Sequence, residues 1–241
     1  MTTNRWTKDQ VKLAFHLYCQ LPYGRIYGRN PEIMALSKVI GRTADAVAMK
    51  MLNIASIDPA ITSTGRVGLG NASALDKEVW DEFHADWDRL VIECHKQMPP
   101  TDYTGSTKPV LTEQRVKQNF FRRAVLSSYR NRCCMSGVSE PRLLVASHIV
   151  PWSIDTANRL NPSNGLCLSA IHDRAFDQGL ISLTDDFKVI VSSELKRKDD
   201  RFTQSTFAAL DGCAIELPER FEPEPSFAAW HRRELFLDNR K

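Results

Sequence analysis

The sequence predicts an α+β protein with a helical N-terminal domain and a smaller mixed C-terminal domain. Residues 1–98 place apolar side chains at helical spacing behind residues typical of helix N-caps. Residues 98–109 are rich in Pro, Gly, Ser and Thr and have no periodicity, which is typical of a linker. Residues 112–241 alternate short apolar runs with helical segments. We therefore expect domains at 1–98 and 112–241, joined by a linker at 99–111.

The composition excludes several other classes of protein. Of the 241 residues, 42% are hydrophobic and 25% are charged, which is typical of a globular chain and not of a disordered one. No apolar run approaches the ~20 residues that span a bilayer, and the first ten residues lack an apolar signal-peptide core. The six cysteines include no CxxC pair, so we expect reduced thiols without a disulfide framework or structural zinc. These features predict a cytoplasmic protein without a membrane partner.

The clearest local pattern in the first domain is a pair of helices at 31–40 and about 44–55. Asn30 and Thr43 are suitable N-cap residues for the two helices. Gly41 can end the first helix because glycine readily adopts the left-handed conformation of a C-terminal cap. Two helices joined by so short a turn have helix-turn-helix spacing, although an ordinary helical bundle has the same pattern.

Basic residues give the candidate contacts to DNA. In the helix-turn-helix interpretation, Arg42 and Lys50 lie at the start of the second helix and within it. Residues 106–132 carry seven basic residues and one acidic residue, a surplus that suits a polyphosphate backbone. A solvated helix face explains the same surplus equally well. The candidate phosphate contacts in and after this stretch are Arg122, Arg123, Arg130, Arg132 and Arg174.

Three polar residues in the second domain point to chemistry: His148, Asn164 and His172. His148 ends a predicted strand, and a polar loop returns the chain to a second strand that begins after Asn164. A helix at about 170–177 follows directly and carries His172. We expect the two imidazoles to converge with the amide between them, so that one ring acts as a general base and the other binds a metal. Asn164 would bridge backbone groups of the loop.

This segment resembles the HNH endonucleases, whose catalytic unit is the ββα-metal finger. The resemblance is carried by SHIVPW at 147–152, NPSNGLCL at 161–168 and HDRAFDQG at 172–179, and it extends over about 115–195. It implies that His148 is the general base, that Asn164 orients the loop and the base, and that His172 ligates one divalent metal ion. Mg²⁺ is the expected ion, and Mn²⁺, Ni²⁺ and Zn²⁺ are alternatives.

The resemblance also leaves the metal shell open. Asp177 matches a recurrent Asp of this branch of the family and could add a ligand or stabilise the helix. Ser147 stands where many members have an acidic residue or His, so water, Ser147 or Asp177 would complete the shell. Arg174 follows His172 by two residues and either contacts the scissile phosphate or is solvated.

We therefore expect a metal-dependent DNA endonuclease with double-stranded DNA as its partner, in a restriction or defence role that includes modified DNA as a candidate substrate. Cutting both strands with one site per chain requires a homodimer or two successive nicks. Two alternatives stay open. The first is a DNA-binding regulator that keeps a degenerate nuclease fold, and the second is a phosphodiesterase that acts on RNA.

Overall fold

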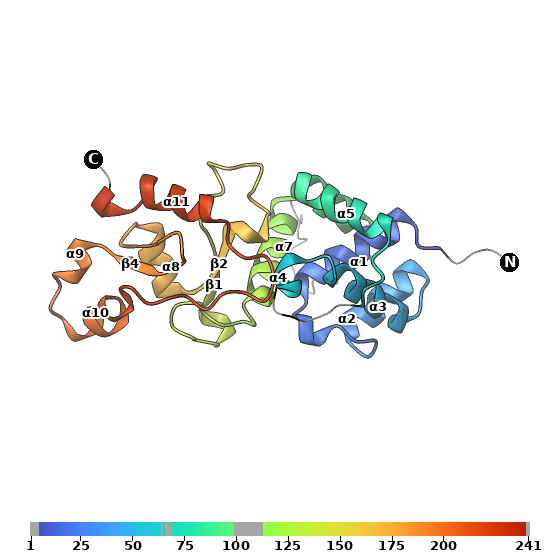
Figure 1. Ribbon diagram of the computed structural model, residues 1–241, viewed down its shortest axis with the longest axis horizontal. Coiled ribbons are helices and arrows are strands. Elements are labelled where there is room, and N and C mark those ends of the chain that lie inside the picture. Colours follow the sequence, from blue (N-terminus) through green and yellow to red (C-terminus); the bar gives the residue numbers. More distant parts are fainter. Residues whose placement is uncertain (1–4, 64, 66–68, 99–112, 240–241) are drawn as a thin grey trace, which may run out of the picture. The chain divides into compact units, whose positions relative to one another are not determined.

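The computed structural model describes residues 5–63, 65, 69–98 and 113–239, and they form two compact units, Met1–Ser128 and Tyr129–Lys241 (Figure 1). The first unit is helical, and the second combines helices with two small antiparallel sheets. This confirms the predicted α+β class. None of the helices in these described ranges has the length and apolar content needed to cross a membrane.

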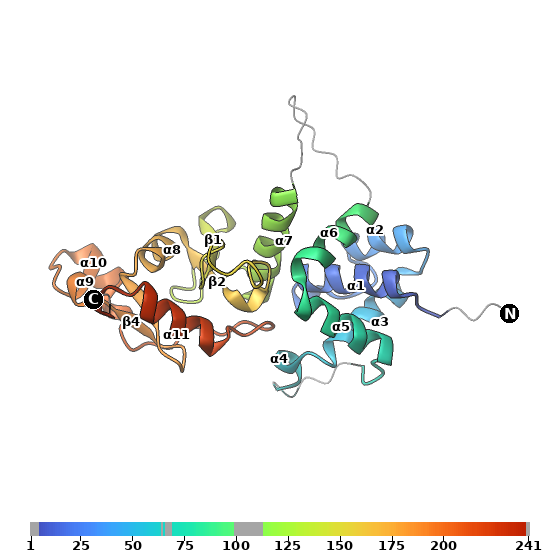
Figure 2. The same cartoon turned by 90° about the horizontal axis from the view of Figure 1, so that it is seen from above.

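Helix α1 (Lys8–Gln20) is the centre of the first unit (Figure 2). All its residues from Val11 to Gln20 are buried, because α1 packs against α2, α3, α5, α6 and α7. Thr7 and Gln10 form the capping box that starts it. The other helices of the unit are α2 (Pro31–Ile40), α3 (Ala44–Ala55), α4 (Pro59–Thr62), α5 (Ala74–Ala85), α6 (Trp87–Gln97) and α7 (Glu113–Ser128), with the 3₁₀ turn η1 (Tyr23–Arg25) before α2.

The predicted helix pair is present as α2 and α3. The Asn30 side chain accepts hydrogen bonds from the first turn of α2, and the Thr43 hydroxyl accepts one from the first turn of α3. Gly41 ends α2 at φ 66°, in the left-handed region that a side chain would disfavour. Local chemistry in the sequence therefore sets both ends of the turn.

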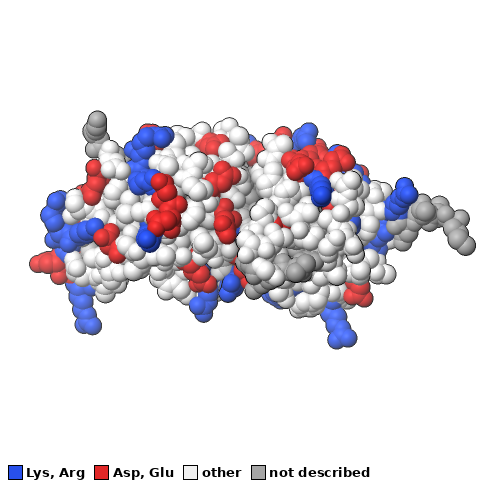
Figure 3. Space-filling model, viewed as in Figure 1, with Lys and Arg blue, Asp and Glu red and all other residues white. Residues whose placement is uncertain are grey.

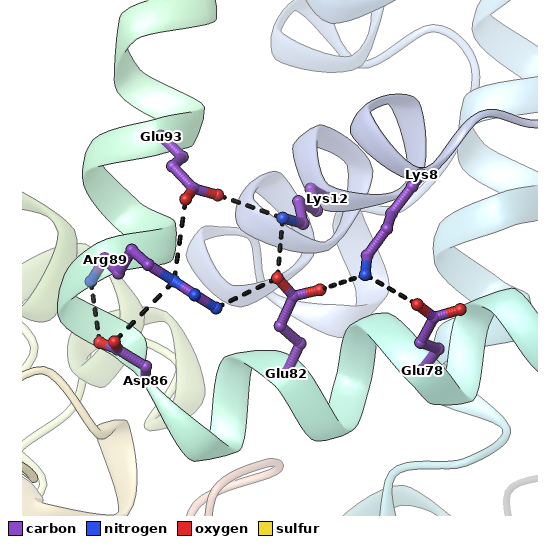
Figure 4. Close-up of polar contacts among 7 residues, drawn as sticks. All are labelled: Lys8, Lys12, Glu78, Glu82, Asp86, Arg89 and Glu93. Carbon is purple, nitrogen blue, oxygen red and sulfur yellow. Dashed lines mark hydrogen bonds and ion pairs between the residues drawn. The ribbon is translucent and has the colours of Figure 1, made fainter.

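A network of ion pairs ties α1 to α5 and α6 (Figure 4). Glu82 is its centre, since it pairs with Lys8 at 2.9 Å, with Lys12 at 2.9 Å and with Arg89 at 3.2 Å. Burial raises the pKa of Glu82, but hydrogen bonds from the two lysines outweigh burial and lower it. The remaining members are Glu78, Asp86 and Glu93.

Helix α7 packs in the first compact unit, whereas the division expected from the sequence joined residues 112–131 to the second domain. Phe120 lies 5.1 Å from the ring of His16 and 6.0 Å from that of Trp87, centroid to centroid. Lys117 adds a 2.8 Å ion pair to Asp88 of α6. A linker marks a break along the chain but does not decide which core an apolar helix face joins. The expected linker at 99–111 lies outside the described residues.

The second unit begins with the order strand, strand, helix. Strands β1 (Leu144–His148) and β2 (Gly165–Ser169) are antiparallel, and they pair Leu144 with Ser169 at one end and His148 with Gly165 at the other. Helix α8 (Ala170–Asp177) follows β2 without a loop and packs on both strands. This is the ββα arrangement expected from the sequence.

The rest of the second unit supports this core. Strands β3 (Ile181–Leu183) and β4 (Val189–Val191) form the second sheet, and α11 (Pro225–Glu234) packs on β3. The shorter elements are η2 (Pro141–Leu143), η3 (Pro162–Asn164), α9 (Ser193–Lys196), α10 (Arg201–Thr206), η4 (Ala208–Leu210) and η5 (Leu237–Asn239). Buried His231 of α11 ties the end of α8 to β3, since its ring nitrogens contact the Phe176 carbonyl at 3.1 Å and the Ser182 hydroxyl at 2.8 Å.

Candidate functional site

His148 ends β1 with its ring held in one orientation. Its Nε2 lies 2.9 Å from the backbone carbonyl of Arg159, which can only accept, so Nε2 carries the proton and donates it. In the neutral ring the lone pair is then on Nδ1. The Trp152 ring packs edge-on at 5.5 Å between centroids. Burial lowers the pKa of His148, and the hydrogen bond to Arg159 only partly opposes this, so the ring is neutral and able to accept a proton at neutral pH.

Asn164 closes the loop between β1 and β2. Its side chain is fully buried and pairs with both backbone groups of Val150, accepting from the amide at 2.8 Å and donating to the carbonyl at 3.1 Å. The side-chain NH₂ of Asn164 also donates to the backbone carbonyl of Asn158 at 3.3 Å. This is the bridging geometry that the sequence suggested for Asn164, whereas its part in a reaction remains a prediction.

Two carboxylates lie one turn apart on α8, Asp173 and Asp177. Burial raises the pKa of both, and the negative charge of Asp173 raises the pKa of Asp177 further, which places the two groups within electrostatic reach of each other. The charge of Arg174 opposes both shifts. Asp177 was a candidate from the sequence and Asp173 was not, although their i, i+4 spacing puts them on the same side of a helix.

Ser147 lies beside Asp173, the first residue of this pair. Its hydroxyl is close enough to Asp173 to favour the ionised carboxylate, yet it has no hydrogen-bond partner at ordinary geometry among the described residues. Ser147 is 2% exposed, so its oxygen is a buried polar atom that lacks a full partner. The carboxylates of Asp173 and Asp177 and the hydroxyl of Ser147 form what we call the oxygen cluster.

The oxygen cluster fits a hard divalent cation. Carboxylate and hydroxyl oxygens suit Mg²⁺, which is commonly bound by one or two carboxylates and keeps several waters, and they suit Mn²⁺ as well. They suit Zn²⁺ and Ni²⁺ less well, since those ions favour imidazole and thiolate ligands. Within the described part of the chain, no three His, Cys, Asp or Glu side chains gather closely enough to hold a metal. Waters and substrate oxygens would have to complete the shell.

His172 lies in a different environment from His148, which corrects the expectation that the two rings meet. Its Nδ1 is 2.7 Å from the hydroxyl of Ser169, at the end of the β1–β2 ladder away from His148, and 3.8 Å from the thiol of Cys133. Its Nε2 is 3.2 Å from the carbonyl of Thr206. Both ring nitrogens are therefore engaged by protein groups, in a residue that is 3% exposed.

The helix period explains this difference. His172, Ala175 and Phe176 form the buried face of α8, whereas Asp173 and Asp177 lie on the adjacent face. Burial lowers the pKa of His172, but its hydrogen bonds to the Cys133 thiol and the Thr206 carbonyl outweigh burial and raise it. Burial raises the pKa of the Cys133 thiol, but hydrogen bonds with His172, Ser136 and Met135 outweigh burial and lower it to about 6.

Two of the predicted DNA contacts in the first unit are used internally. Lys50 is 6% exposed and pairs with the buried carboxylate of Asp76 at 2.8 Å, so it cannot reach a nucleic acid. The guanidinium of Arg42 donates to Gln10 at 3.1 Å and stacks over Trp6 at 4.6 Å. A sequence pattern identifies a cation but not the buried carboxylate or aromatic ring that will engage it.

The other predicted DNA contacts fall into two groups, arginines that pair with a glutamate and arginines that are exposed. Arg123 pairs with Glu32, and Arg130 pairs with Glu219 at 3.1 Å. Arg122, Arg132 and Arg174 are exposed. On the face that Figure 3 draws, acidic and basic side chains are interspersed without a continuous basic surface.

Residues 133–184 match the model of a family described as HNH endonuclease. The match spans β1, β2 and α8, together with His148, Asn164 and the oxygen cluster. This segment is an HNH endonuclease domain. No curated protein matches the chain significantly. The HNH domain indicates a nuclease that acts on nucleic acid, and HNH nucleases generally use a divalent metal.

Proposed function

We propose that the protein is a metal-dependent endonuclease that hydrolyses phosphodiester bonds of double-stranded DNA. The observation that carries this proposal is the orientation of His148, whose Nε2–H is bound to the Arg159 carbonyl so that Nδ1 is the proton acceptor. The oxygen cluster begins at Ser147, the neighbouring residue in β1. A base and a candidate cation site are thus built on adjacent residues of one strand.

The proposed mechanism divides the work between these groups. Nδ1 of His148 takes the proton of the attacking water, and the lowered pKa of the ring keeps it neutral and ready to do so. A divalent ion, when bound, neutralises charge on the phosphate and on the leaving 3′ oxygen. Asp173, Asp177 and Ser147 would hold that ion. Asn164 keeps the loop that carries the Arg159 carbonyl in place, and exposed Arg174 contacts the phosphate.

Asp173 replaces His172 in this proposal. His172 is the metal ligand that the family resemblance implies, but Ser169 and Thr206 engage both of its ring nitrogens. Asp173 is the next residue, and it lies beside Ser147 and within electrostatic reach of Asp177. We therefore assign His172 a structural role in holding α8 and Asp173 the ligand role.

A plasmid-nicking assay tests the function. We expect conversion of supercoiled DNA to the nicked form with Mg²⁺ or Mn²⁺ and none with EDTA. The His148→Ala variant should lose about 10²–10⁴-fold in rate, the typical contribution of a general base. The matched control is His95→Ala, which removes an imidazole of the first unit. Unchanged cleavage by His148→Ala would exclude the proposed base.

The same assay addresses the finer parts of the proposal. Modified and unmodified plasmids test a restriction or defence role, and labelled RNA tests the alternative substrate. Binding of DNA without cleavage under every metal condition would favour a DNA-binding protein with an inactive nuclease fold. Linear product that appears only after nicked product would favour successive nicks over concerted cutting by a homodimer.

A further inference from the structure

We propose that Asp155 is a positioning residue for the base, acting through Asn158 to hold the Arg159 carbonyl against the ring of His148. The inference rests on the proposed function, since it assumes that His148 is the base. Asp155 lies in the loop between β1 and η3, outside the polar residues already placed in the site.

This loop contains no helix or strand between His148 and Pro162, so backbone bonds within its turns and side-chain hydrogen bonds together set its shape. Its first turn is closed by backbone bonds from Ile154 and Asp155 to the Pro151 carbonyl, at 2.9 and 3.3 Å. Beyond that turn, the residue that organises the backbone is Asp155.

The Asp155 carboxylate accepts three hydrogen bonds from the residues that follow it. Oδ1 accepts from the backbone amides of Ala157 at 3.1 Å and Asn158 at 3.0 Å. Oδ2 accepts from the side-chain amide of Asn158 at 2.8 Å. One carboxylate thus fixes both the backbone and the side chain of Asn158, and bonds to an ionised acceptor are stronger than neutral ones.

The fixed position of Asn158 affects two groups of the site, the side chain of Asn164 and the carbonyl of Arg159. Its carbonyl accepts from the Asn164 side chain at 3.3 Å and from the Asn161 amide at 3.1 Å. The next carbonyl along the chain is that of Arg159, which accepts from Nε2 of His148 at 2.9 Å. The Asn158 carbonyl lies in the peptide unit directly before Arg159, and the Arg159 carbonyl lies in the unit directly after it. A shift of the backbone at Asn158 therefore displaces Arg159 and with it the carbonyl that holds the proton of His148 on Nε2.

The contact between the two side chains can be broken and rebuilt. In Asp155→Asn, the new amide nitrogen at Oδ2 would face the amide nitrogen of Asn158, so two donors oppose each other. In Asn158→Asp, two carboxylates oppose each other. The double variant Asp155→Asn with Asn158→Asp restores a donor facing an acceptor, and it keeps the Asn158 oxygen that accepts from Asn161 at 3.3 Å.

The experiment reads the His148 tautomer directly, by ¹H–¹⁵N spectra of the imidazole nitrogens in the full-length, metal-free protein. We expect the proton on Nε2 in the wild type, a mixture of tautomers in each single variant, and Nε2 again in the double variant. His148→Ala identifies the signals, and circular dichroism shows that each variant is folded. If one of the single variants does not fold, the other tests the same contact between the side chains of residues 155 and 158.

Cleavage kinetics complete the test. We expect kcat of plasmid nicking to fall about 10- to 100-fold in the single variants with KM little changed, and to recover in the double variant. A wild-type tautomer in a folded single variant would overturn the positioning role, as would failure of the double variant to restore it. A wild type with the proton on Nε2 that cleaves no nucleic acid would count against the proposed function while the tautomer series still decides the role of Asp155.

Discussion

Replacing His172 and Asp173 one at a time should separate stability from metal-dependent activity. In His172→Ala, the Ser169 hydroxyl and the Thr206 carbonyl lose their partner inside the protein, and the lost ring leaves a cavity beside Phe207, whose ring centroid is 5.6 Å away. Orphaned buried groups cost about 1–3 kcal/mol each, and truncation of a buried ring costs about 3–5 kcal/mol. Because these terms overlap, we expect a loss of about 3–5 kcal/mol, or roughly 10–20 °C in Tm for a unit of this size.

Asp173→Asn should behave in the opposite way. Burial already disfavours the Asp173 charge, so its removal should change stability by less than about 1 kcal/mol. Nicking with Mg²⁺ should nevertheless fall by at least about 100-fold, since the oxygen cluster loses a charged ligand. Thermal unfolding followed by circular dichroism gives the stability, and nicking well below the lower Tm gives the activity.

The assignment fails if the two variants exchange phenotypes. A folded His172→Ala protein that has normal stability but no Mg²⁺-dependent activity would make His172 the ligand. A fully active Asp173→Asn protein would remove Asp173 from the oxygen cluster. The matched control is Asp185→Asn, which removes an exposed carboxylate of the same unit outside the oxygen cluster.

Two further predictions concern charge and pH. Burial lowers the pKa of His148, so its protonation stops the reaction only below the usual imidazole range. The nicking rate should therefore rise through mildly acidic pH and be flat above about pH 7. An inflection above pH 7 in the pH–rate profile would contradict this. Asp76→Asn should lower the unfolding free energy by about 3–5 kcal/mol in urea titrations, because it leaves the buried Lys50 ammonium unpaired. Glu78→Gln, which removes an exposed partner of Lys8, is the control, and an equally small loss in both variants would show that the buried pair contributes little.

The pair of helices α2 and α3 was predictable because its signals are local. Asn30, Gly41 and Thr43 act on backbone groups within one turn of themselves, so their effect is independent of the rest of the chain. The same holds for the ββα order, since the turn residues before Gly165 and the helix directly after β2 are set by neighbouring residues. The spacing of His148 and Asn164 therefore located the loop and its two anchors.

Contacts between distant residues were not predictable in this way. Lys50 and Asp76 are far apart in the chain, and only the packing of α3 on α5 makes one neutralise the other. Likewise α7 joins the first core because it packs on α1 and α6, although its position after the linker suggested membership in the second domain.

The sequence alone determined the α2–α3 pair, the ββα order and the resemblance of one segment to HNH endonucleases, because capping, turn chemistry and spacing act over a few residues. The tertiary structure decided which side of α8 is buried. That choice placed His172 inside, against Ser169 and Thr206, and left Asp173 beside Ser147. The physical reason is that adjacent helical residues differ by about 100° in direction, so only the position of the neighbouring elements determines which one enters the core and which one faces the site.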